Sequence, residues 1–115
     1  MKIYVCGPIS GYEDYNLPAF NEAEQTLKNL GHETINPCSL DGDGSRRETW
    51  ESYLKRDLKL LVDCDAVLLL DNWHSSRGAM LEFYVATNLK LKFYFWDRLT
   101  VGHYVGDKNL YAIHN

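Results

Sequence analysis

Ser76, Gly78 and Glu82 follow the most apolar run of this 115-residue sequence. The run, residues 66–70, has no polar alternation, which is typical of a strand buried on both faces of a parallel sheet. A helical pattern begins at Gly78, and the free amide groups of a helix N-terminus bind anions. Glu82 lies one helical turn beyond Gly78, on the face that points back toward the loop. Ligands of open α/β sheets lie outside the carboxyl ends of the strands. We therefore expect the functional site in this segment.

A second candidate loop, residues 7–11, closes a first predicted strand at residues 2–6. Gly7 and Gly11 permit a close approach of the backbone to a ligand, and Ile9 and Ser10 lie between them. The spacing is not G-x-G-x-x-G, so the dinucleotide fingerprint is absent. Tyr4, within the strand, is open to two interpretations, a core aromatic or a site residue.

Asp57 is the third chemical candidate. It lies in a predicted helix, residues 48–62, at the edge of the apolar stripe formed by Trp50, Leu54, Leu58 and Leu61. A carboxylate beside apolar neighbours is costly unless it has a partner or a function. The alternative is a surface salt bridge to Arg56 or Lys59.

The remaining pattern predicts the elements that position these residues. A helix over residues 18–30, with Asn16 as N-cap and Gly31 as stop, precedes a strand at 32–36 and a long polar loop at 38–47. A further helix from Gly78 would turn a set of apolar residues toward the sheet: Ala79, Leu81, Val85, Ala86 and Leu89. Strands follow at 90–96 and, as a possible fifth, at 110–113. We therefore predict one domain over residues 1–115, a three-layer, doubly wound, mostly parallel α/β sheet of flavodoxin-like order 2-1-3-4.

Composition narrows the functional classes. The formal charge is −4 with no basic cluster, which argues against binding of a nucleic-acid polymer and favours a free nucleotide if nucleic-acid chemistry is involved. No apolar run approaches the roughly 20 residues that span a bilayer, so we expect no membrane partner and a cytoplasmic location. The three cysteines have no C-x-x-C spacing and the four histidines are scattered, so we expect no metal and interpret the cysteines as small hydrophobes.

Taken in order, several segments resemble the nucleoside 2-deoxyribosyltransferase superfamily. They are I-Y-V-C-G-P-I-S-G at the start, R-D-L in the second helix, D-A-V-L-L-L in the buried strand and S-x-G-x-x-x-E after it. Within that superfamily the chain is similar to small phage and bacterial proteins of the DUF4406 type and to 2′-deoxynucleoside 5′-phosphate N-hydrolases.

The resemblance implies roles for the three chemical candidates. Glu82 would attack C1′ of the deoxyribose and form a glycosyl ester, as the nucleophile of a retaining glycosidase does. Asp57 would assist the departing base as a general acid or orient the sugar, and Tyr4 would orient the nucleophile.

The resemblance also implies a set of binding residues. Ser76, six positions before the glutamate, would contact a 5′-phosphate. Ser10 stands where the N-hydrolases carry arginine, and Arg77 would replace that charge or remain a solvent-exposed helix-start residue. Trp73 would stack on the base or pack beneath the loop. The full predicted substrate-binding set is Gly7, Ile9, Ser10, Gly11, Asp71, Trp73, Ser76, Arg77 and Gly78.

The predicted activity is cleavage or exchange of the N-glycosidic bond of a 2′-deoxynucleoside 5′-monophosphate, without a cofactor. Two alternatives stay open: a nucleotide-sequestering protein with little turnover, and a glycosyl hydrolase of NAD or ADP-ribosyl compounds. We also expect a homo-oligomer, a dimer or higher, because Tyr94, Trp96, Tyr104 and Tyr111 occupy edge or tail segments that one domain would not fully bury. The alternative is that the tail covers these rings within one chain.

Overall fold

The computed structural model describes residues 1–41 and 48–97. Four parallel strands form one sheet in the order β2-β1-β3-β4, as predicted. Their bounds are Lys2–Cys6 (β1), Glu33–Ile35 (β2), Ala66–Leu69 (β3) and Lys92–Phe95 (β4). The two central strands, β1 and β3, are almost entirely buried, because every inner position carries an apolar or aromatic side chain.

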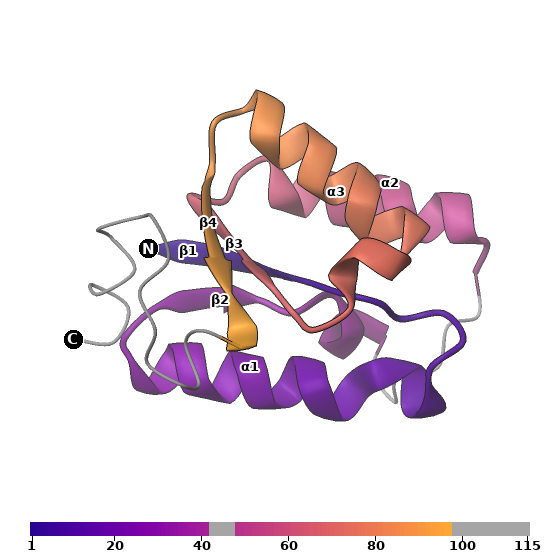
Figure 1. Cartoon of the computed structure of the whole chain (residues 1–115), viewed down its shortest axis with the longest axis horizontal. Coiled ribbons are helices and arrows are strands. Elements are labelled where there is room, and N and C mark those ends of the chain that lie inside the picture. Colours follow the sequence, from indigo (N-terminus) through magenta and orange to yellow (C-terminus); the bar gives the residue numbers. More distant parts are fainter. Residues whose placement is uncertain (42–47, 98–115) are drawn as a thin grey trace.

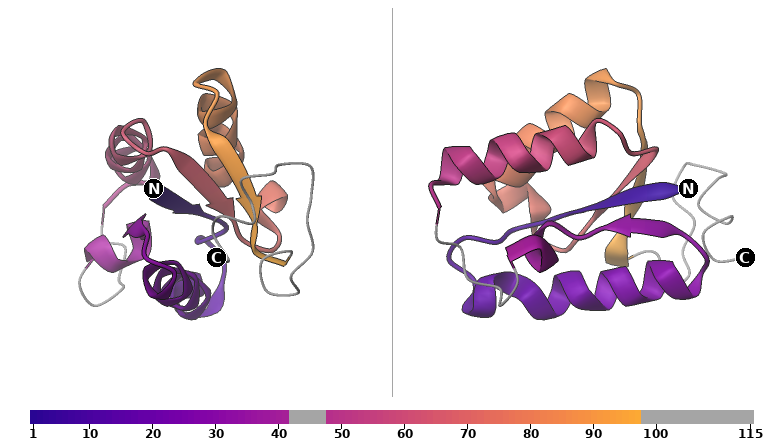
Figure 2. Two further views of the ribbon diagram at one scale, coloured as in Figure 1. Left: turned by 90° about the vertical axis from the view of Figure 1, so that its left-hand side faces the viewer. Right: turned by 180° about the vertical axis from the view of Figure 1, so that it is seen from behind.

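Helices cover both faces of this sheet and make the predicted three layers. Helix α1 (Leu17–Asn29) lies on one face, and α2 (Trp50–Leu61) and α3 (Arg77–Asn88) lie side by side on the other (Figures 1 and 2). Strand β1 alternates between two cores: Ile3 and Val5 face α1, whereas Tyr4 and Cys6 face α2 and α3. This alternation turns Tyr4 toward the two helices that carry the other chemical candidates.

Helix ends mostly follow local chemistry. Gly31 has φ +91°, the left-handed conformation that ends α1. Thr49 accepts a hydrogen bond from the Ser52 amide and starts α2. Asn16 occupies the predicted N-cap position of α1, but it is left-handed and its side-chain amide donates to the Pro8 carbonyl, so its side chain makes no capping hydrogen bond.

The predicted inner faces of α2 and α3 need correction. In α2 the buried row is Tyr53, Asp57 and Leu61, so Asp57 lies at the centre of the inner face and not at its edge. In α3 the buried residues are Ala79, Glu82 and Ala86, while Leu81 and Leu89 are exposed. The difference from the prediction has the same cause in both helices. Each helix turns a carboxylate toward the sheet, whereas hydrophobic periodicity alone predicts a neighbouring leucine at that place.

Other predictions are refined or lie outside the described residues. The predicted loop at residues 38–47 begins as a 3-10 helix, Pro37–Asp41. Tyr94 is fully buried in the core beneath α1, so its ring offers no partner surface, whereas Trp96 packs against the same core and is only partly buried. Tyr104, Tyr111 and the possible fifth strand fall outside the described residues.

None of the helices in residues 1–41 and 48–97 has the length and apolar character needed to cross a membrane. Within the same residues, histidine, cysteine, aspartate and glutamate form no group of three or more that could hold a metal ion.

Candidate active site

A small cleft of about 40 Å³ opens at the carboxyl edge of β1, between α2 and α3. Three segments supply its walls: the loop after β1, the inner face of α2 and the first turns of α3. The lining residues are Gly7, Ile9, Ser10, Trp50, Leu54, Asp57, Ser76, Gly78, Ala79 and Glu82. The cleft therefore contains two carboxylates and the N-terminus of a helix. It lies where the sequence predicted the functional site.

Glu82 lies at the base of the cleft and is only 7% exposed. The Tyr4 hydroxyl donates a hydrogen bond to Oε2 of Glu82, and the Cys6 thiol lies 3.5 Å from Oε1 with geometry for a second, weaker one. Tyr4 and Cys6 are two positions apart on β1, so both side chains point to the same face of the sheet. A carboxylate buried this deeply is held in place by its donors rather than by solvent.

Burial and charge keep these two donors protonated. Desolvation raises the pKa of the Tyr4 hydroxyl well above its usual value, and the nearby carboxylates of Glu82 and Asp57 raise it further. Desolvation and Glu82 likewise raise the pKa of the Cys6 thiol. Because a thiolate is the reactive form of cysteine, Cys6 serves here as a neutral donor and not as a nucleophile.

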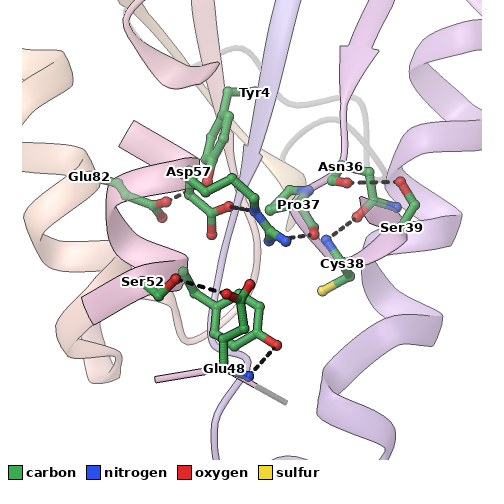
Figure 3. A network of polar contacts seen from close by, with 11 residues as sticks. Tyr4, Asn36, Pro37, Cys38, Ser39, Glu48, Ser52, Asp57 and Glu82 are labelled. Carbon is green, nitrogen blue, oxygen red and sulfur yellow. Dashed lines mark hydrogen bonds and ion pairs between the residues drawn. The ribbon is translucent and has the colours of Figure 1, made fainter. Parts of the chain in front are cut away.

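Asp57 faces the cleft from α2 and is 4% exposed. Its Oδ1 accepts from Nε of Arg56 at 2.9 Å, and Nη2 of Arg56 donates to the Pro37 carbonyl at 3.1 Å. Figure 3 shows Tyr4, Glu82 and Asp57 together, with the polar network running from Asp57 to Pro37. The predicted alternative is right about the partner, which is Arg56, but the carboxylate of the pair is buried, while the Arg56 side chain is 29% exposed.

The N-terminus of α3 forms the mouth of the cleft. Ser76 is the N-cap, and its Oγ accepts from the Ala79 amide at 3.2 Å. The Arg77 guanidinium lies over the Trp50 ring, 4.4 Å from its centroid. A wider hollow of about 410 Å³ adjoins the cleft here and is lined by Ser10, Trp50, Ser76, Arg77 and Gly78 among others. Hydroxyls, amides and one cation thus gather where an anion would sit.

The first loop contributes less than predicted. Ile9 and Ser10 line the cleft, but Gly11 does not. Gly11 has φ +83°, a left-handed conformation that favours glycine, so the turn explains this residue. A Cβ at Gly7 would lie 2.9 Å from the Cβ of Leu70, so packing against the sheet also requires glycine there. The absence of a side chain at Gly7 therefore does not by itself indicate a ligand.

The structure does not bring Asp71 and Trp73 into this cleft. Both line a separate hollow beyond β3 together with His74. The Trp73 ring packs on Phe83, with centroids 4.7 Å apart, which favours the packing alternative over base stacking in the cleft. Asp71 is exposed, since the chain turns outward after the buried strand.

Sequence reasoning missed four residues of the site. Cys6 was interpreted as a hydrophobe, and Arg56 as one of two surface partners. Trp50 and Leu54 were assigned to the core stripe of α2, but they also form a wall of the cleft. The signal that was available is the spacing of Trp50, Leu54 and Asp57, which places all three on one helical face.

With this geometry in hand, the chain can be set beside known proteins. A family model described as "Domain of unknown function (DUF4406)" matches residues 1–95. No curated protein sequence matches the chain.

Two solved structures share the fold. One is a 2-deoxyribosyltransferase from the psychrotolerant bacterium Bacillus psychrosaccharolyticus, described as a biocatalyst for the synthesis of nucleosides. Its TM-score is 0.65 and its identity 23%, over 83% of this chain and 71% of that one. The other is a 2-deoxyribosyltransferase from Leishmania mexicana, with TM-score 0.63 and 16% identity over 92% of this chain and 74% of that one. At these identities the likeness establishes a common fold.

Proposed function

Because the chain belongs to the DUF4406 family and shares its fold with two 2-deoxyribosyltransferases, we propose that it cleaves or exchanges the N-glycosidic bond of a 2′-deoxynucleoside 5′-monophosphate. The observation that carries the proposal is the placement of Glu82 at the base of the cleft, with the Tyr4 hydroxyl on one of its oxygens. The enzyme would be an N-glycosidase or a deoxyribosyltransferase and would need no cofactor.

Glu82 is the nucleophile in this proposal. One carboxylate oxygen attacks C1′ while the bond from C1′ to the base nitrogen breaks, and the electron pair of that bond leaves with the base. The product is an ester between Glu82 and the deoxyribosyl phosphate. Water then attacks C1′ in hydrolysis, or a second base does so in transfer, and the carboxylate is regenerated. The Tyr4 hydrogen bond supports this role because it fixes the plane of the carboxylate toward the cleft.

The 5′-phosphate is assigned to the mouth of the cleft. Ser76 and the first amides of α3 offer hydrogen-bond donors, and Arg77 offers a positive charge at the same helix end. Since Ser76 Oγ accepts from the Ala79 amide, its hydroxyl proton remains available to donate to a phosphate oxygen.

The proposal is tested with a panel of 2′-deoxynucleoside 5′-monophosphates, the matching nucleosides and NAD. Each is incubated with and without a second free base, and released base and new nucleotides are separated by chromatography. Base release from the monophosphates supports the proposal, and a new nucleotide formed only with added base identifies transfer. Base release from NAD alone would replace the proposal by hydrolysis of ADP-ribosyl compounds, and binding without turnover would replace it by nucleotide sequestration.

A further inference from the structure

We propose that Arg56 is a positioning residue that holds Asp57 as a carboxylate, so that Asp57 acts in the cleft by accepting hydrogen bonds and not by protonating the departing base. This inference rests on the proposed function, because it assigns a mode of action to one residue of that site. It decides between general acid and orienting acceptor, the two roles that the sequence left open for Asp57.

The first step is that Arg56 is fixed by the fold. Its Nη2 donates to the Pro37 carbonyl, in the 3-10 helix after β2, at 3.1 Å. Its guanidinium also lies over the Tyr53 ring, 5.0 Å from the centroid, and the Glu48 amide donates to the Tyr53 hydroxyl at 3.0 Å. The charged group therefore reaches Asp57 from a position that other contacts maintain (Figure 3).

The second step is the charge of the donor to Asp57. Asp57 accepts from a cation at 2.9 Å, and the Asp57 side chain is only 6% exposed. Glu82 accepts from Tyr4, a neutral hydroxyl on β1, with the neutral Cys6 thiol beside its other oxygen. An opposite charge at hydrogen-bond distance favours the ionised form of a carboxyl group, the more so where solvent does not screen it.

The third step concerns Glu82. Glu82 and Asp57 line the same cleft, so their negative charges repel each other, and without a counter-charge two such carboxylates would tend to share one proton. The charge of Arg56 offsets that of Asp57, so Glu82 also remains ionised, as a nucleophile must. Arg56 thus acts on the reaction through two carboxylates without touching the reacting atoms.

A chemical consequence follows for the leaving group. The electron pair of the broken bond stays on the base nitrogen, which takes its proton from water in the open cleft. In hydrolysis a water molecule then attacks C1′ of the ester, and the proton that it releases neutralises the hydroxide left behind, so protons and charge balance over the cycle.

The test compares Arg56→Gln with the matched control Lys59→Gln. Lys59 is an exposed cation on the same helix, two positions from Asp57, so both variants remove one positive charge. For Arg56→Gln we expect kcat near pH 7 to fall by about tenfold or more and to recover as the pH is raised, because the acid limb of the profile moves upward. Lys59→Gln should keep the wild-type profile. A general acid behaves oppositely: loss of Arg56 would make protonated Asp57 more abundant and would maintain or raise kcat.

A second measurement needs no turnover and follows the wild-type protein itself. The ¹³C resonances of labelled aspartate carboxyl groups are followed with pH in the wild-type protein, and the Asp57 signal is assigned by its loss in Asp57→Asn. We expect the chemical shift of an ionised carboxylate at neutral pH, and a protonated Asp57 at that pH would overturn the inference. If no substrate is cleaved, the proposed function fails, yet this titration still shows whether Asp57 is a carboxylate, and repeating it in Arg56→Gln shows whether Arg56 holds it so.

Discussion

The Tyr4 hydroxyl donates a hydrogen bond to Oε2 of Glu82 across 78 positions of sequence. Tyr4 comes from the central strand β1 and Glu82 from the inner face of α3, so this contact exists only when strand and helix are packed together. Parallel pairing of β1 with β3 brings the α3 N-terminus to the carboxyl edge of β1. The same packing that forms the core therefore assembles the candidate catalytic residues.

Tyr4→Phe should separate catalysis from packing at this contact. The ring still fills the core, but Glu82 loses a donor, and a hydrogen bond to a charged group is worth about 1.5–3 kcal/mol. We expect kcat/KM for base release to fall by about one to two decades. Tyr94→Phe is the matched control, because Tyr94 is also fully buried but lies on the other face of the sheet. Equal losses of activity in the two variants would remove Tyr4 from the site.

Ser76→Ala should weaken binding of a 5′-monophosphate by about one to two decades, while the matching nucleoside loses little. The substitution also removes the N-cap of α3, which costs roughly 1 kcal/mol of stability. Thr49→Ala controls for that cost, since Thr49 is the N-cap of α2 and is absent from the lining of the cleft. Calorimetry with both ligands measures the difference, and equal losses for nucleoside and nucleotide would mean that Ser76 does not contact phosphate.

Two glycines at the cleft should respond in opposite ways to alanine. At Gly7 the new methyl group would lie 2.9 Å from Leu70 Cβ, so we expect Gly7→Ala to cost about 1–3 kcal/mol of unfolding free energy. At Gly78, within α3, the nearest atoms lie 3.8 Å or more away, so Gly78→Ala should be neutral or stabilising by up to about 1 kcal/mol. Urea unfolding of both variants measures the contrast. A Gly7→Ala protein as stable as the wild type would contradict this expectation and would show that the loop after β1 can shift to relieve the contact with Leu70.

Stability should fall at alkaline pH. Burial raises the pKa of Cys64 to about 11 and raises the pKa values of Cys6 and Tyr4 as well. Each group binds its proton more tightly in the folded chain, so its contribution is full below the unfolded pKa and is lost as the pH rises toward the folded pKa. We expect the urea midpoint to fall between about pH 9 and pH 11, and to fall less in Cys64→Ala, where one such group is absent. An identical decline in both proteins would exclude Cys64 as a cause.

The sequence predicted the architecture because its strongest signals are local. The apolar run of β3, the glycine that ends α1 and the serine that starts α3 each act within a few residues. The strand order followed from the alternation of strands and helices. Glu82 and Ser76 could be proposed from the sequence for the same reason, since their spacing lies within one strand–loop–helix unit, and the structure places both in one cleft.

The partners of those residues could not be found in this way. Asp57 was placed at the edge of a hydrophobic stripe because periodicity ranks leucine above aspartate, whereas the ion pair with Arg56 makes its burial tolerable. Cys6 was interpreted as a hydrophobe because its geometry toward Glu82 depends on packing between β1 and α3. The choice between base stacking and packing stayed open for Trp73, because only the tertiary structure shows that its ring packs on Phe83.

The central claim is that Glu82 becomes covalently attached to the sugar, and acid quenching during turnover of a 2′-deoxynucleoside 5′-monophosphate tests it most directly. Mass spectrometry of the intact protein and of the peptide with Glu82 should show an added deoxyribosyl phosphate. Glu82→Gln, chosen because it keeps the volume of a side chain that is 7% exposed, should show no adduct and lose several orders of magnitude in base release while remaining folded. Base release at an undiminished rate by Glu82→Gln, or an adduct on another residue, would contradict the account.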